Sequence, residues 1–104
     1  MAEFVQAAVG PSFWLSDTVS VTVPSITDPD IAKVDVDVSA GSTFQPVIGD
    51  AVIAIPLVAL PTNCRLQGSQ VTTTDTVQVT FGSEGGNVTG AAKNFKFLYI
   101  DCTP

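Results

Sequence analysis

Apolar and polar residues alternate with a period of two along most of this chain, and that alternation limits the fold more than any other feature. Residues 18–23 alternate valine with serine or threonine, and residues 34–38 alternate valine with aspartate. Residues 76–81 repeat the pattern, and residues 95–100 carry Phe95, Phe97 and Tyr99 at alternate positions. Successive side chains of a strand point to opposite faces, so each segment predicts a strand with one apolar face against a core.

Two further segments predict strands of a different kind. Residues 51–55 are apolar on both faces, which is typical of a strand buried on two sides, either central or sealed under a neighbour. Residues 64–71 predict a weaker strand with Gly68 as a bulge. A turn at residues 73–75 should join it to the following strand as a hairpin.

Short strands separated by turn signals predict an all-β fold, a small antiparallel β-sandwich or a Greek-key or jelly-roll-like barrel. We expect about seven or eight strands and little helix, because no long window shows helical periodicity with start and stop signals. The length of 104 residues suits one domain over residues 16–104. Residues 1–15 are either an arm or a first strand with Trp14 in the core, and we favour the strand. The glycine-rich residues 82–90 predict a mobile loop.

Charged residues are scarce, at 13% of the chain where about 25% is usual, while 45% of the residues are apolar. Such a chain has little charge with which to cover its exterior. We therefore expect part of the surface to be apolar and covered by partners or by copies of the same chain, because large apolar patches mark interaction sites.

The net charge of −6 argues against nucleic acid as a partner, because it repels phosphate and provides no basic stripe. No apolar run is long enough for a membrane helix, and Pro56 interrupts the longest one. The first residues show no secretory signal, so we expect synthesis in a cytoplasm.

The sequence contains no histidine, which excludes Ser-His-Asp and Cys-His catalysis and a Cys-His zinc site. We expect no enzymatic activity, no cofactor and no metal, although an acidic cluster could hold a hard cation through oxygen ligands. The two cysteines predict buried free thiols, with a disulfide left open. The acids of that cluster are Asp28, Asp30, Asp35 and Asp37, and the cysteines are Cys64 and Cys102.

The second half of the chain resembles small β-sandwich proteins of tailed-bacteriophage virions, which decorate or cement capsids or form parts of tails. The resemblance covers about half of the chain and lies in residues 49–52, 59–61, 71–79, 87–90 and 95–97. It implies a capsid decoration protein on the virion surface that binds the major capsid protein or another virion protein. It also implies a homo-oligomer, most often a trimer. Many weak contacts repeated around a shell would give avidity.

Candidate interface residues come from the apolar start of the chain and from the glycine-rich loop. They are Phe4, Val5, Phe13, Trp14, Leu15, Glu84 and Asn87. The alternative is a tail, neck or fibre component that contacts carbohydrate on the host surface. A free carbohydrate-binding module is a third hypothesis, but its usual exposed aromatic rings are scarce in a chain with one tryptophan and one tyrosine.

Overall fold

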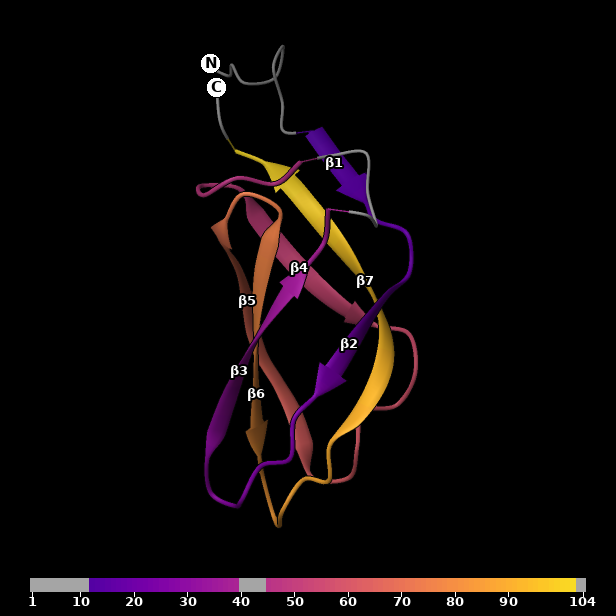
Figure 1. Ribbon diagram of the computed structural model, residues 1–104, viewed down its shortest axis with the longest axis vertical. Coiled ribbons are helices and arrows are strands. Elements are labelled where there is room, and N and C mark those ends of the chain that lie inside the picture. Colours follow the sequence, from indigo (N-terminus) through magenta and orange to yellow (C-terminus); the bar gives the residue numbers. More distant parts are fainter. Residues whose placement is uncertain (1–11, 40–44, 103–104) are drawn as a thin grey trace, which may run out of the picture.

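The computed structural model describes residues 12–39 and 45–102, which form a sandwich of two antiparallel sheets (Figure 1). The predicted all-β class is confirmed in its sandwich form. That part of the chain contains no helix, and so none that could span a membrane. The seven strands are β1 (Ser12–Leu15), β2 (Val19–Val23), β3 (Ile31–Asp37), β4 (Ala51–Pro56), β5 (Cys64–Thr73), β6 (Thr76–Ser83) and β7 (Ala91–Asp101).

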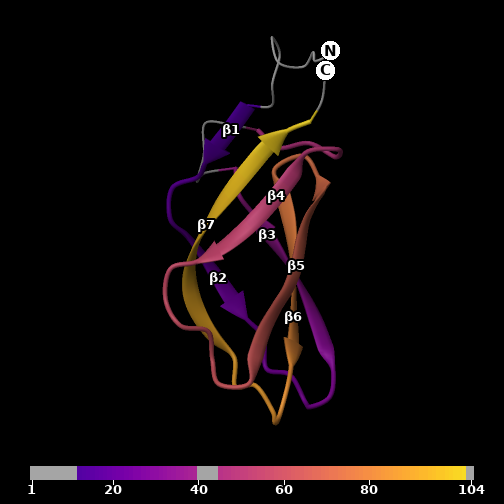
Figure 2. The same ribbon diagram turned by 180° about the vertical axis from the view of Figure 1, so that it is seen from behind.

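The larger sheet is built around β7. Along one edge of β7, β2 pairs with its first half and β1 with its last residues, while β4 pairs along the other edge. In the smaller sheet, β6 lies between β3 and β5. β4 and β5 lie side by side in the view from behind (Figure 2), where the Ser69 hydroxyl donates a hydrogen bond of 2.9 Å to the Val52 carbonyl. This bond ties the two sheets together at one edge.

Aromatic rings and valines from the two inner faces fill the core. Phe95, Phe97 and Tyr99 are fully buried and stack in sequence along β7, with ring centroids 6.3 and 6.4 Å apart. Phe81 of β6 meets Phe95 edge-on at 6.2 Å, a favourable geometry for aromatic pairs. The alternation therefore predicted the inner face correctly in β2, β3, β6 and β7. The buried valines of these strands are Val21, Val23, Val36, Val77 and Val79.

Burial raises the pKa of Tyr99 to about 12, and the negative charge of Asp75 adds to the rise. The folded protein thus holds the phenol proton more tightly than the unfolded chain, in which tyrosine titrates near pH 10. The stability supplied by the protonated phenol is complete below about pH 10 and is lost as the pH rises towards 12. We expect the free energy of unfolding to fall by roughly 2–3 kcal/mol across that range.

Tyr99 is the single tyrosine, so phenolate absorbance reports on it alone. The titration should have its midpoint near pH 12 in the folded protein and near 10 in concentrated urea. Tyr99→Phe should weaken the alkaline loss of stability. A midpoint near 10 in the folded protein would show that the phenol is exposed to solvent.

The β5–β6 hairpin is confirmed, and the predicted bulge lies one residue earlier than expected: Leu66 pairs with Phe81 and Gly68 with Thr80, so Gln67 is the extra residue. The prediction for residues 82–90 needs correction. Gly82 and Ser83 belong to β6, and Val88 is buried and forms a bridge with Ile26 through two backbone hydrogen bonds. A single apolar residue that reaches the core thus anchors the glycine-rich loop.

Two expectations of burial are wrong in the isolated chain. β4 is an edge strand that buries Val52 and Ala54 but exposes Ile53 to 49%. Trp14 is 42% exposed because β1 lies at the edge of its sheet, beside the last residues of β7. Residues 12–15 do form a strand, and residues 1–11 lie outside the described part of the chain.

The two thiols are not bonded to each other. Cys64 is half-buried at the start of β5, and burial raises its pKa, whereas Cys102 is exposed just after β7. The prediction that both are buried is thus wrong for Cys102. Cys64 pairs with Ser83, at the end of the sandwich where β7 begins, so the two cysteines lie at opposite ends. This placement leaves no route to a disulfide within one folded chain.

Candidate interaction surfaces

The outer face of the larger sheet is apolar in the half that contains β1, β4 and the end of β7. Residues paired across strands share a face, and the odd-numbered residues of β7 point inwards, so its even-numbered residues point outwards. One row across the sheet joins Leu15, Leu98 and Ile53, and the next joins Phe13, Ile100 and Ala51. We call this surface the apolar outer face: Phe13, Leu15, Ile53, Ile55, Leu57, Leu98 and Ile100.

Four of these side chains are strongly exposed for their size, whereas Ile55, Leu98 and Ile100 are partly buried. Phe13 is 61% exposed, Leu15 57% and Ile53 49%. Leu57 continues the pairing of β4 through a 2.9 Å hydrogen bond to the Asn94 carbonyl and is 46% exposed. Single exposed leucines are common, but neighbouring rows of them mark a surface that a partner covers.

One extra residue between β1 and β2 creates this surface. Leu15 pairs with Leu98, whereas Val19 pairs with Phe95, so three intervening residues on this edge face two on β7. A one-residue shift turns every following side chain to the other face. The odd-numbered residues of β2 therefore point into the core, while Phe13 and Leu15 of β1 point outwards.

Ser16 holds the irregular edge in place. Its side chain is buried, its hydroxyl accepts the Phe97 N–H at 2.9 Å, and the same hydroxyl donates to the Asp17 carbonyl at 2.8 Å. The hydroxyl thus satisfies a buried backbone donor of the central strand.

Ser16→Ala should therefore destabilise the domain by about 1–3 kcal/mol, since it leaves the Phe97 amide without its side-chain acceptor. Urea unfolding measures the loss, and hydrogen exchange should show faster exchange at the Phe97 amide. Ser20→Ala, at an exposed position on β2, is the control and should change stability by less than about 0.5 kcal/mol. Equal effects from the two substitutions would contradict the role of the Ser16 hydroxyl.

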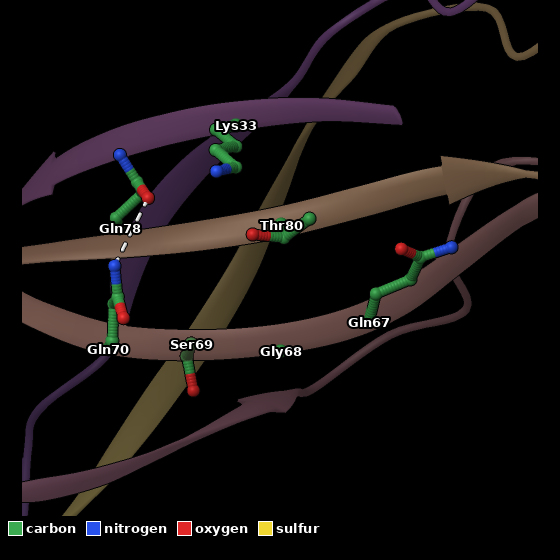
Figure 3. Close-up of a pocket in the computed structure, with 7 residues that line it drawn as sticks. All are labelled: Lys33, Gln67, Gly68, Ser69, Gln70, Gln78 and Thr80. Carbon is green, nitrogen blue, oxygen red and sulfur yellow. Dashed lines mark hydrogen bonds between the residues drawn. The ribbon is translucent and has the colours of Figure 1, made fainter. Parts of the chain in front are cut away.

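The outer face of the smaller sheet is polar and contains a shallow hollow of about 330 Å³ over β3, β5 and β6. One row joins Lys33, Thr80 and Gly68. The next row joins Asp35, Gln78 and Gln70. Gln70 Nε2 donates to Gln78 Oε1 at 3.4 Å (Figure 3), and Gln78 Nε2 donates to Asp35 Oδ1 at 3.3 Å.

The sequence predicted some of these surface residues and missed others. Phe13 and Leu15 lie on the apolar outer face, whereas Trp14 pairs with Tyr99 on the opposite side of the sheet. Phe4 and Val5 lie outside the described residues. The sequence reasoning missed four residues of this surface, Ile53, Leu57, Leu98 and Ile100. The apolar run that begins at residue 51 was a signal for the first two.

Glu84 and Asn87 do not join the apolar outer face. They lie in the loop before β7, whereas β1 lies beside the end of β7, at the other end of the sandwich. Glu84 forms an ion pair with Arg65 at an exposed position. Asn87 Oδ1 accepts the Asp28 N–H at 2.9 Å. The structure thus gives both side chains local partners within the chain.

The acidic residues of β3 share one face, as the alternation predicted. Asp35 and Asp37 are both exposed, and the Ser39 backbone N–H lowers the pKa of Asp37 through a hydrogen bond of 2.9 Å. Within residues 12–39 and 45–102, no three His, Cys, Asp or Glu side chains gather closely enough to hold a metal ion. The described acids therefore provide no cation site.

No protein-family model, curated protein or solved structure matches the chain. The features of the described residues that bear on function are therefore the apolar outer face of the larger sheet and the polar outer face of the smaller one.

Proposed function

We propose that this protein is a structural subunit of a bacteriophage virion, a capsid decoration protein that binds the assembled shell and stabilises it. In this role it carries out no reaction. Its partners are the major capsid protein or a neighbouring virion protein, together with further copies of the same chain in a closed homotrimer.

The apolar outer face is the observation that supports this proposal. Its rows are continuous across three strands, and Lys96 is the one charged residue that the described pairing places among them. The chain has a net charge of −6, and the charged side chains on its other surfaces can keep it dissolved. The apolar outer face carries little of that charge. Contact with an apolar surface of a shell subunit would remove these side chains from water, which contributes roughly 25 cal/mol per Å² against the entropy cost of association.

The rigid support of the apolar outer face also suits a protein that adds to a shell late in assembly. The apolar side chains stand on a preformed sheet, so binding orders few additional groups and loses little conformational entropy. Repetition of a modest contact around a shell would then hold each oligomer by avidity.

Co-sedimentation of the purified protein with shells that lack it tests the proposal. We expect saturable binding with many copies per shell, together with greater resistance of the shell to heat. Absence of binding to shells would reject the decoration role.

A tail, neck or fibre subunit is the second candidate. The polar outer face of the smaller sheet favours it, because this face stays available for a second partner when the apolar outer face is covered. Binding to isolated tails in a few copies, without binding to shells, would support this candidate instead.

A further inference from the structure

We propose that the hollow on the smaller sheet is a binding site for a neutral pyranose sugar. We call it the polar hollow, and it is lined by Lys33, Gln67, Gly68, Ser69, Gln70, Gln78 and Thr80. This inference goes beyond the proposed virion role and does not depend on it.

The absence of a side chain at Gly68 opens the hollow. A Cβ atom built at Gly68 would meet no atom within 4 Å, and the backbone there is not in the left-handed region. Neither crowding nor backbone conformation therefore requires glycine at this position. Glycine inside a strand weakens it and often marks a place where a ligand approaches the backbone. The bare backbone of Gly68 forms the floor on which a ring could rest.

The bulge places Gln67 on the rim of the polar hollow. The extra residue of β5 lies between Leu66, which pairs with Phe81, and Gly68, which pairs with Thr80. The Gln67 amide lies over the bare backbone of Gly82, where an added Cβ would come within 2.2 Å of Nε2. Gly82 thus leaves room for the Gln67 side chain, which borders the hollow next to Gly68.

The remaining side chains offer donors and acceptors in one small area. Gln70 donates to Gln78, which donates to Asp35, so each amide group is oriented and keeps a second N–H for a ligand. Figure 3 shows Lys33 and Thr80 over the middle of the sheet, while Ser69 points away towards β4. Within the described part of the chain, Lys33 makes no ion pair, so its ammonium group can donate to a ligand.

This mixture of groups selects the class of ligand. Sugar hydroxyls donate and accept at once, which matches the amides, the hydroxyl and the ammonium group that line one ring-sized space. An apolar ligand would find no apolar side chain in the lining, and one lysine beside Asp35 is too little positive charge for nucleic acid. The volume of about 330 Å³ is at the small end of ligand pockets, so we infer one or two sugar rings.

The site should be weak, because no aromatic ring lines it for the sugar to stack on. We expect millimolar dissociation constants for a single copy. Many copies on one particle would raise the effective affinity for a sugar-coated surface.

Titration of ¹⁵N-labelled protein with methyl glycosides of glucose, galactose, rhamnose and N-acetylglucosamine, followed by NMR, tests the proposal. At least one glycoside should produce saturable shifts confined to amides of β3, β5 and β6 around Lys33, Gly68 and Thr80. If none of the four produces a saturable shift there, the hollow is ordinary solvated surface and the proposal is wrong.

Gly68→Val is the decisive variant, since it covers the floor and its Cβ would meet no atom within 4 Å. We expect at least about tenfold weaker sugar binding, with an equal or higher melting temperature because valine favours strands more than glycine does. Ser20→Val, on the outer face of the other sheet, is the matched control and should bind sugar like the unmodified protein. Sugar binding that survives Gly68→Val unchanged would overturn the proposed site, whether or not the protein binds shells.

Discussion

Replacement of Phe97 by alanine is expected to lower the free energy of unfolding by about 3–5 kcal/mol. Phe97 is fully buried in the central strand of the larger sheet, and its ring is stacked between those of Phe95 and Tyr99. The substitution leaves a cavity between two rigid rings and removes both aromatic contacts. Domains of this size are stable by about 5–15 kcal/mol, so much of the total would be lost.

Thermal unfolding followed by circular dichroism measures this effect. The midpoint should fall by roughly 15–30 °C for a domain of about 100 residues. Leu98→Ala is the matched control, because Leu98 is the next residue on the same strand and belongs to the apolar outer face. It should cost less, about 1–2 kcal/mol, because Leu98 is only partly buried and its truncation opens no enclosed cavity. Equal losses for the two variants would mean that the outer face is already covered in the free chain.

The double substitution of Leu15 and Ile53 by lysine is expected to abolish shell binding and leave the fold intact. The two residues flank Leu98 in one row, and both are about half exposed, so lysine can reach solvent in the free protein. In a complex, two unpaired ammonium groups would be buried against an apolar surface, which is costly. We expect binding at least about 100-fold weaker, and stability changed by no more than about 1 kcal/mol.

The control places two lysines on the outer face of the same sheet, in its polar half. Ser20 and Thr22 are exposed there and pair with Asn94 and Ala92. The Ser20→Lys and Thr22→Lys double variant adds the same charge and should bind shells as the unmodified protein does. If both double variants lose binding equally, net charge and not the apolar outer face controls attachment.

Much of the fold could be predicted from the sequence because a core strand requires alternation. Val21, Val36, Val77 and Phe97 lie on the faces that their spacing indicated. Apolar character therefore predicted the inner faces of both sheets well.

The same reasoning failed between β1 and β2, where one extra residue changes which side chains face the core. Phe13 and Leu15 are in step with Val19, and a regular strand would have buried all of them on one side. The extra residue next to Ser16 turns the first two outwards. The segment reads Ser16-Asp17-Thr18, and these residue types do not by themselves indicate which position is the extra one.

The apolar run at residues 51–55 shows a second limit. It predicted a strand buried on both faces, but only the face of Val52 and Ala54 is buried, and Ile53 on the other face is exposed. Sequence reports whether a surface prefers to be covered and does not report which molecule covers it. The polar hollow escaped prediction for a similar reason: Gly68 was predicted to be a bulge, but its open surroundings depend on three strands at once.

Cryo-electron microscopy of the assembled particle shows directly whether the apolar outer face is covered. We expect many copies of this sandwich on the shell, with Leu15, Ile53 and Leu98 covered by a shell protein or by another copy of the chain. A particle in which these three side chains face bulk solvent would contradict this expectation.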